Sequence, residues 1–257
     1  MTDNSPIAVF DSGLGGLSVF SEVVRALPNE SVIYYGDGKN CPYGDKTREE
    51  VIEIVDGIAK FLISKGAKLI VVACNTATAD AIDYLRSTYD VPFVGMEPAV
   101  KPAARASKSG VVGILATAPT LEGRLFKETT EKYAEGVKVI PRVGENFVEL
   151  VEADRENTPE AETVVASVIR PLIEQGADHL VLGCTHYPFL SGVMERIIGD
   201  RNITIVNPAP AVARRVKDML EQKGLSAATG HIPEYEYFTS GDEAYLKRIT
   251  EKAAGLM

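Results

Sequence analysis

A thirteen-residue segment that occurs twice is the feature that most restricts the fold of this chain. Residues 62–74 read LISKGAKLIVVAC and residues 172–184 read LIEQGADHLVLGC, with six identical positions at an offset of 110 residues. A second match, Pro-Ala-Val, begins at Pro98 and again at Pro210. A helix, a Gly-Ala turn and a buried strand are common in α/β proteins, so one match alone would carry little weight. Two matches in the same order predict an internal duplication.

Short apolar runs alternate with amphipathic segments along the chain. The apolar runs predict buried strands at residues 7–10, 32–35, 69–73, 111–115, 137–140, 180–182 and 203–206. The segments between them predict helices at residues 48–65, 78–87, 120–133, 159–175 and 211–223. This alternation is typical of mostly parallel sheets with helices on both faces. We therefore predict an α/β fold of two similar domains, formed by residues 1–97 plus 211–257 and by residues 98–210.

The composition excludes several classes of protein. The chain has 257 residues and a formal net charge of −9, so it lacks the basic footprint of a nucleic-acid or anionic-membrane binder. It has no apolar stretch of ~20 residues and begins without a signal peptide, which predicts a cytoplasmic protein. We expect no N-terminal regulatory extension, because only a few residues precede the first strand. Three cysteines without metal-ligand spacing predict free thiols and no metal site.

Two of the cysteines occupy equivalent places in the repeat. Cys74 and Cys184 each follow directly on a buried strand, at its carboxyl end, which is where open α/β sheets bind ligands. Two copies facing each other would place these thiols on opposite walls of one cleft. A single cysteine after a strand is more often inert packing than chemistry, but a pair placed by a repeat favours chemistry. Cys41 has no counterpart in the repeat and is interpreted as incidental.

A glycine-rich loop follows the first strand. Residues 10–18 read FDSGLGGLS, and the N–H groups at the start of the following helix could bind an anion. The loop resembles a dinucleotide fingerprint except that Ser18 stands where a glycine belongs, and Asp37 lies where a ribose-binding acid would be. A nucleotide site therefore remains an alternative. Asp11 can face the cleft from the end of its strand, although it or Ser12 can also cap the helix.

Other polar residues stand near these positions. His186 is two residues beyond Cys184, close enough to exchange a proton with it or with a substrate amine. The donors at the start of each following helix would favour the thiolate form of the cysteine before it. Tyr43 and Gly44, in the loop after the second strand, can offer a hydroxyl and an N–H to a carboxylate. The other two histidines, His179 and His231, have no such company and receive no role.

Three motifs give the chain a family resemblance. DSGLGG at 11–16, ACNTAT at 73–78 and LGCTHYP at 182–188 resemble the signatures of glutamate racemases, which belong to the aspartate/glutamate racemase superfamily. PYG at 42–44 and ELVE at 149–152 fit the same family, so the resemblance covers nearly the whole chain in the correct order. One departure is the segment GDGKN at 36–40, where many members read GDTAR; it affects a loop and not the chemistry.

The resemblance implies a fold, an activity and a set of site residues. It implies two similar α/β domains with the substrate between them, a homodimer, no pyridoxal phosphate or other cofactor, no metal, and D-glutamate made for peptidoglycan. Cys74 and Cys184 would be the acid/base pair, with Asp11 beside the first, His186 beside the second, and Glu152 as a further candidate near the second. The residues that would hold the substrate are Asp11, Ser12, Asp37, Tyr43, Gly44, Asn75, Thr76, Thr185 and His186.

The chemistry of racemisation fits this pair of thiols. One cysteine, as thiolate, removes the α-proton, while the other, as thiol, returns a proton to the opposite face. Nearby donors would stabilise the carboxylate as it gains enolate character. The alternatives are an aspartate racemase or another cofactor-independent isomerase of the superfamily; two cysteines argue against a decarboxylase. A non-catalytic amino-acid-binding protein is the alternative of another class, and it would need no thiols.

Overall fold

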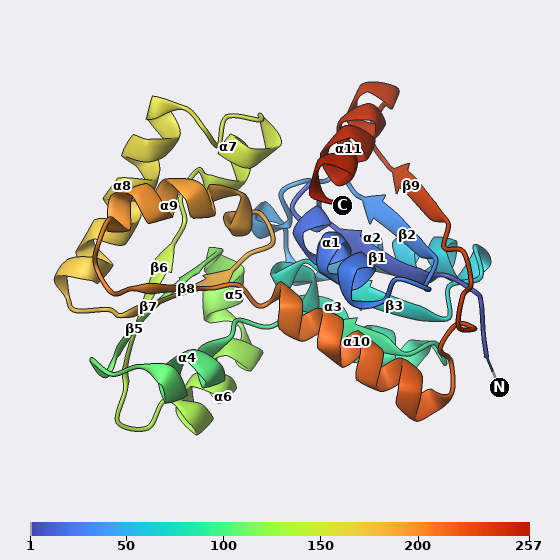
Figure 1. Ribbon diagram of the computed structural model, residues 1–257, viewed down its shortest axis with the longest axis horizontal. Helices are drawn as coiled ribbons and strands as arrows, with labels where there is room; N and C mark the ends of the chain where they lie inside the picture. Colours follow the sequence, from blue (N-terminus) through green and yellow to red (C-terminus); the bar gives the residue numbers. More distant parts are fainter. Residues whose placement is uncertain (1) are drawn as a thin grey trace. The chain divides into compact units, whose positions relative to one another are not determined.

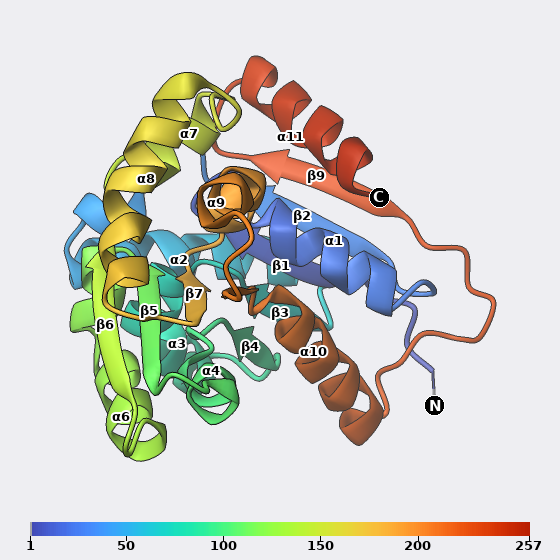
Figure 2. The ribbon, with the colours of Figure 1, turned by 60° about the vertical axis from the view of Figure 1, so that its left-hand side comes forward.

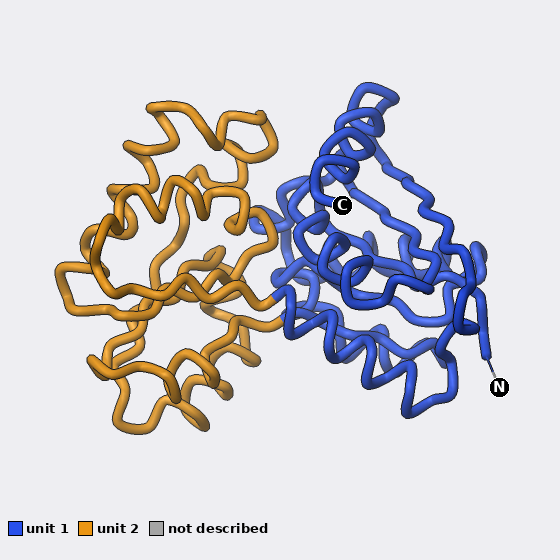
Figure 3. Tube along the Cα trace, viewed as in Figure 1, with its two compact units in different colours: residues 1–96, 209–257 blue, residues 97–208 orange. Residues whose placement is uncertain are grey.

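The chain forms two compact units, which Figure 3 shows in different colours. The computed structural model describes residues 2–257. The first unit comprises the chain up to Met96 together with Ala209–Met257, and the second comprises Glu97–Pro208. Across residues 2–257, every helix falls short of the length and apolar character that crossing a membrane requires.

The first unit is built on a five-stranded sheet in the order β4-β3-β1-β2-β9, in which all neighbouring strands are parallel. Figure 1 shows β3, β1, β2 and β9 of this sheet. Its strands are β1 (Ile7–Asp11), β2 (Val32–Gly36), β3 (Leu69–Val72), β4 (Phe93–Gly95) and β9 (Tyr235–Thr239). Its helices are α1 (Leu17–Ala26), the 3₁₀ helix η1 (Tyr43–Asp45), α2 (Arg48–Ser64), α3 (Asn75–Thr88), α10 (Ala209–Lys223) and α11 (Glu243–Leu256). Helix α1 packs against α10 and α11, and α2 packs against α3. These two layers leave β1 and β3 completely buried, as a parallel sheet requires.

The second unit has a four-stranded parallel sheet in the order β6-β5-β7-β8. Figure 2 shows β6, β5 and β7 of this sheet. Its strands are β5 (Val111–Ala116), β6 (Lys138–Val143), β7 (His179–Gly183) and β8 (Thr204–Val206). Its helices are α4 (Val100–Ala106), α5 (Ala118–Glu122), α6 (Arg124–Tyr133), α7 (Phe147–Glu152), α8 (Pro159–Glu174), the 3₁₀ helix η2 (Tyr187–Leu190) and α9 (Ser191–Ile198). Val112, Ile114 and Val181 of β5 and β7 form a buried cluster with Phe126 of α6 and with Val100 and Ala103 of α4.

Both units use the same strand order. In each, the first strand lies between the second and the third, and the fourth lies beyond the third. The two copies of the repeated segment end on β3 and β7, the third strands of their sheets, so Cys74 and Cys184 follow equivalent strands. The predicted α/β fold of two similar parallel sheets is confirmed.

Strands β4 and β9 and the helix expected over 120–133 differ from the sequence-based expectation. Strands β4 and β9 were not expected, because β4 has only three residues and β9 is a partly exposed edge strand without an apolar run. The helix expected over 120–133 is two helices, separated at Gly123, whose backbone is extended with φ −63° and ψ 149°. Glycine is a weak helix former, so the chain can leave the helix there at low cost.

Hydrogen bonds to Asp178 connect the loop before β5 to the repeated segment of the second unit. Its carboxylate accepts hydrogen bonds from the Ser107 hydroxyl at 2.7 Å and from the backbone N–H groups of Lys108 at 2.6 Å and Ser109 at 2.8 Å, and it lies 2.8 Å from His179 Nδ1. Burial by itself raises the pKa of Asp178, but the hydrogen bonds outweigh it and hold the pKa below its usual range.

We expect Asp178→Asn to lower the free energy of unfolding at neutral pH by about 1–2 kcal/mol. A carboxyl whose folded pKa is depressed contributes stability above its unfolded pKa, about 3.9, and that contribution is lost as the pH falls through the folded pKa. Urea unfolding should therefore show a constant gap between wild type and variant above about pH 5 and a shrinking gap below about pH 4. The exposed Asp200→Asn serves as control, and a gap that persists unchanged in acid would contradict a role for the charge of Asp178.

Candidate active site

The carboxyl edge of the first sheet gathers several of the predicted residues. Asp11 is the last residue of β1 and is completely buried. The neighbouring strand β3 ends just before Cys74, and Ala73 N–H donates to the Phe10 carbonyl at 2.9 Å, which carries the β1–β3 pairing up to the cysteine. Adjacent parallel strands end at the same edge of the sheet, so the carboxylate and the thiol share this edge.

The glycine-rich loop folds around the carboxylate of Asp11. The backbone N–H groups of Gly13 and Gly16 donate to Asp11 Oδ2 at 3.1 and 3.0 Å. A Cβ on Gly16 would lie 2.4 Å from the Asp11 Cβ, so only glycine permits this approach. Two of the loop's amides thus face a negative charge of the chain itself, which argues against the alternative of a phosphate-binding loop. Gly16 caps α1 without a side-chain hydrogen bond, so Asp11 is not its N-cap.

Cys74 is the N-cap of helix α3. Its backbone is extended, and its Sγ accepts a hydrogen bond from Ala77 N–H at 3.5 Å. The residue is 6% exposed. Partial positive charge at a helix N-terminus stabilises an anion there, so this position favours a thiolate. The expected helix start next to the first thiol is therefore present.

Tyr43 and Asp37 form a buried pair at the same edge. The Tyr43 hydroxyl donates to Asp37 Oδ2 at 2.6 Å, and both residues are 1% exposed. Burial raises the pKa of Tyr43 well above its usual value, and the negative charges of Asp37, Cys74 and Asp11 raise it further. The Tyr43 phenol therefore stays protonated, and Asp37, Cys74 and Asp11 all lie near enough to influence it.

The remaining predicted residues of the first unit lie around Cys74. Asn75 and Thr76 begin α3 and are buried, as is Ser12, while Gly44 follows Tyr43 in η1 and is partly buried. Asn75 Nδ2 donates to the Met96 carbonyl at 3.5 Å, but Asn75 Oδ1 is buried without a hydrogen-bond partner. A buried acceptor without a donor is costly, so this oxygen is a candidate to receive a donor from a ligand.

In the second unit, Cys184 follows β7 and is 7% exposed. Here the following segment differs from the first unit, because the chain continues through Thr185 and His186 into the 3₁₀ helix η2. The expected start of a regular α-helix next to this thiol is thus absent. An imidazole takes its place: His186 Nδ1 lies 3.7 Å from Cys184 Sγ and 3.5 Å from Thr185 Oγ1.

A carboxylate completes a chain of contacts behind Cys184. Glu152, the last residue of α7, places its Oε1 2.6 Å from His186 Nε2. The His186 side chain is 2% exposed and that of Glu152 is 17% exposed. A carboxylate on one ring nitrogen fixes the orientation of the imidazole and stabilises its protonated form, while the other nitrogen faces the sulfur. The set Cys184, His186 and Glu152 is thus arranged to move a proton to or from the thiol.

Tyr187 and Gly144 hold α7 in this position, and sequence reasoning did not single them out. The Tyr187 hydroxyl donates to the Gly144 carbonyl at 3.3 Å, and its ring meets Phe147 edge to face at a centroid distance of 5.0 Å. A Cβ on Gly144 would lie 2.5 Å from the Tyr187 hydroxyl oxygen, so a larger residue there would displace the loop before α7. The signal in the sequence was Gly144, but its partner, Tyr187, lies 43 residues further along the chain.

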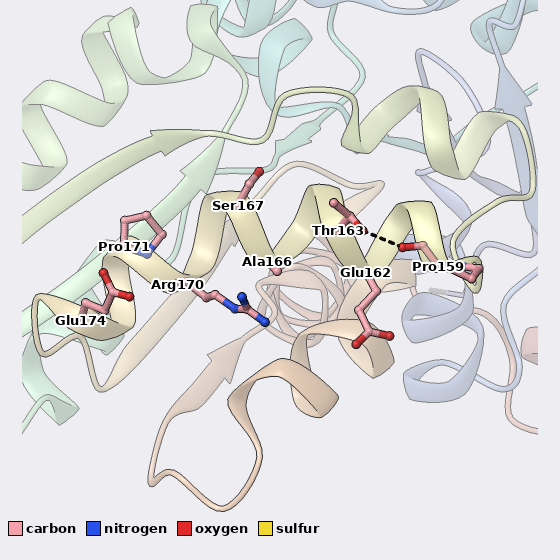
Figure 4. A pocket seen from close by; sticks show the side chains of 8 residues that line it. All are labelled: Pro159, Glu162, Thr163, Ala166, Ser167, Arg170, Pro171 and Glu174. Carbon is pink, nitrogen blue, oxygen red and sulfur yellow. Dashed lines mark hydrogen bonds between the residues drawn. The ribbon is translucent and has the colours of Figure 1, made fainter.

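A surface groove of the second unit is unrelated to these residues. It lies along α8, and Figure 4 shows its lining side chains. They are Pro159, Glu162, Thr163, Ala166, Ser167, Arg170, Pro171 and Glu174. None is a predicted site residue. The Thr163 hydroxyl donates its proton to the Pro159 carbonyl at 3.0 Å. The groove offers no nucleophile paired with a base.

The predicted residues thus fall into two groups, one at the end of each sheet. The first unit brings together Asp11, Ser12, Asp37, Tyr43, Gly44, Cys74, Asn75 and Thr76, and the second unit brings together Glu152, Cys184, Thr185 and His186. Within residues 2–257 no cysteine forms a disulfide, and Cys41 is partly buried in the loop before η1.

Known proteins resemble the chain over nearly its whole length. The family model described as Asp/Glu/hydantoin racemase matches residues 7–216. The glutamate racemase of Herpetosiphon aurantiacus is 42% identical over 248 residues, which are 96% of this chain and 97% of that protein. The crystal structure of glutamate racemase isoform RacE1 from Bacillus anthracis matches with a TM-score of 0.87 and 33% identity, covering 98% of this chain and 95% of the other. Escherichia coli glutamate racemase in complex with L-glutamate and the activator UDP-MurNAc-ala matches with a TM-score of 0.86 and 30% identity, covering 98% and 95%. The chain therefore belongs to the Asp/Glu/hydantoin racemase family.

Proposed function

We propose that this chain interconverts L- and D-glutamate without a cofactor, and that Cys74 and Cys184 are its two proton-transferring groups. The protein is an amino-acid racemase and hence an isomerase. The observation that carries the two-cysteine proposal is the equivalent placement of these thiols. Each follows the third strand of its sheet, and each has its own acid/base neighbour.

The reaction needs two groups in opposite protonation states. A thiolate takes the α-hydrogen as a proton, and the electron pair left on Cα is delocalised into the carboxylate. The second cysteine, as thiol, then delivers its proton to the opposite face of Cα and becomes the thiolate. No atoms are gained or lost, and the reverse reaction exchanges the roles of the two sulfurs.

The neighbours of the two thiols support different ways of handling the proton. Asp11 lies beside the strand that leads to Cys74, and the α3 N-terminus favours the thiolate there. At Cys184 the imidazole of His186, held by Glu152, can share a proton with the sulfur or with the substrate's amine. We propose that Asp11, His186 and Glu152 assist the cysteines in this way.

Substrate binding would use the polar residues around the thiols. Asn75 Oδ1 lacks a donor and suits the α-ammonium group. We propose that Ser12, Gly44, Thr76 and Thr185 supply the remaining donors to the carboxylates, as expected from the family resemblance. These donors would also stabilise the enolate character that the α-carboxylate gains in the transition state.

Glutamate is favoured over aspartate by the relatives. Curated relatives at 42 and 45% identity, from Herpetosiphon aurantiacus and Deinococcus radiodurans, are both named glutamate racemase. We further propose that the protein acts in the cytoplasm as a homodimer and supplies D-glutamate for peptidoglycan. A non-catalytic amino-acid-binding protein would have no use for two thiols at equivalent strand ends.

We expect turnover to survive removal of metals and pyridoxal phosphate. The purified protein would be dialysed against EDTA, treated with hydroxylamine and then incubated separately with L-glutamate and L-aspartate while circular dichroism is followed. The signal of glutamate should decay to zero, and that of aspartate should change far more slowly. Activity that returns only with pyridoxal phosphate or a metal would refute cofactor independence. If the aspartate signal decayed faster than the glutamate signal, aspartate and not glutamate would be the substrate.

A further inference from the structure

The carboxylate of Asp37 is fully engaged by the chain itself. Asn40 Nδ2 donates to both oxygens at 3.0 Å each, the Tyr43 hydroxyl donates to Oδ2 at 2.6 Å, and the Ser240 hydroxyl donates to Oδ1. A carboxylate offers about four lone-pair positions, so these hydrogen bonds fill them. Asp37 therefore has no position left for a substrate amine, although the family resemblance places it among the residues that hold the substrate.

Ser240 reaches Asp37 from the far end of the chain. Strand β9 pairs in parallel with β2, in a register that sets Thr239 opposite Gly36. The Thr239 hydroxyl donates to the Gly36 carbonyl at 2.6 Å. One residue further along both strands, Ser240 stands beside Asp37, and its Oγ accepts from Lys39 N–H at 3.1 Å. The strand register thus brings Ser240 next to Asp37.

Helix α11 holds the same loop from the other side. A Cβ on Gly38 would lie 2.5 Å from the ring of Tyr245, and one on Gly36 would lie 2.9 Å from Ile249 Cδ1. These two glycines allow α11 to pack directly on the backbone that flanks Asp37. The C-terminal segment, β9 with α11, therefore packs against the loop that carries Tyr43.

The contact with Asp37 decides what Tyr43 can offer to a ligand. Its hydroxyl has one proton, and that proton points to Asp37 Oδ2. Burial and the charges of Asp37, Cys74 and Asp11 keep the pKa of Tyr43 high, so the proton is retained. The phenol oxygen can then only accept further hydrogen bonds. It suits a donor such as an ammonium group and does not suit a carboxylate.

We propose that Ser240 is a positioning residue of the racemase, which acts through Asp37 to orient the Tyr43 hydroxyl so that its oxygen receives the substrate's α-ammonium group. The proposal rests on the proposed racemisation of glutamate. Asp37 is then the link between the C-terminal segment and the substrate, and not itself a ligand. The ammonium group is present in substrate and transition state alike, so this interaction governs KM more than kcat.

The test compares Ser240→Ala with Ser240→Thr, which keeps a hydroxyl, and with Ser240→Cys, whose thiol is a weak donor. We expect Ser240→Ala to raise KM for both L- and D-glutamate roughly tenfold while kcat changes less than about twofold. Ser240→Thr should restore the wild-type KM, and Ser240→Cys should lie between. Thr250→Ala removes a hydroxyl that bonds only within α11 and is the matched control.

A double-mutant cycle with Tyr43→Phe separates positioning from general damage. If Ser240 acts through Tyr43, adding Ser240→Ala to Tyr43→Phe should leave KM unchanged relative to Tyr43→Phe alone. Additive effects, an unchanged KM in Ser240→Ala, or a fall in kcat that follows a fall in melting temperature would overturn the proposal. A wild-type protein that does not racemise glutamate would instead refute the proposed function, so the two failures are distinct.

Discussion

Serine in place of Cys74 or Cys184 should reduce the racemisation of glutamate by at least about a thousandfold. Serine has a similar size, but its hydroxyl is far less acidic than a thiol with a usual pKa of about 8.5, so it cannot act as a comparable base at neutral pH. Each variant should fold, because Cys74 and Cys184 lie at strand ends, where the small polar side chain of serine can be accommodated. Melting temperatures within a few degrees of wild type would confirm that the loss is chemical.

Each variant should nevertheless keep one half of the reaction. Removing the α-proton needs only one base, and that base remains on the side of the surviving thiol. A glutamate analogue with chloride at the β-carbon reveals this step, because the electron pair from the C–H bond then forms a Cα–Cβ double bond and expels chloride. No proton has to be returned, so elimination continues where racemisation has stopped.

The two variants should eliminate opposite enantiomers of this analogue. From the family resemblance we expect Cys74 to act on the D enantiomer and Cys184 on the L enantiomer. Cys41→Ser, which removes the third thiol, should keep wild-type racemisation and is the matched control. Elimination of the same enantiomer by both variants, or near-full racemisation in either, would rule out two thiols acting on opposite faces.

Asn in place of His186 or of Asp11 should slow proton transfer roughly a hundredfold, each on one side of the reaction. His186 lies 3.7 Å from Cys184 Sγ and is held by Glu152, so its loss removes the proton relay of the second thiol. Asp11 shares the sheet edge with Cys74, and asparagine can still accept from Gly13 and Gly16 while it lacks the charge. The two variants should therefore slow proton transfer at opposite faces of Cα.

The measurement is the primary isotope effect with α-deuterated glutamate in each direction. Slower abstraction on one side makes that step more rate-limiting, so the isotope effect should rise with D-glutamate in Asp11→Asn and with L-glutamate in His186→Asn. His231→Asn makes the same exchange at the histidine that contacts Ser31 and should change nothing. Equal isotope effects in both directions for both variants would show that the assignment to separate sides is wrong.

The sequence alone determined the strands with continuous apolar runs and the repeat that relates the two sheets. Strands such as β3 lie buried on both faces, so every residue must be apolar, and the run is visible without any knowledge of its neighbours. The same local logic placed the cysteines at strand ends and predicted α2, whose capping box of Thr47 and Glu50 is encoded within four residues. These are short-range features, in which the residues themselves carry the signal.

Tertiary structure alone decided the features that depend on distant pairing. Strand β9 reads YEYFT and has no continuous apolar run, and its strand partner β2, some 200 residues earlier in the chain, supplies its hydrogen bonds. For the same reason the hydrogen bond from Ser240 to Asp37 could not be predicted, since it depends on the register of that pair. The contact of His186 with Glu152 spans 34 residues and follows from the packing of Tyr187 under α7. The local sequence identifies the groups capable of chemistry, whereas sheet register and side-chain packing decide which of them are hydrogen-bonded to one another.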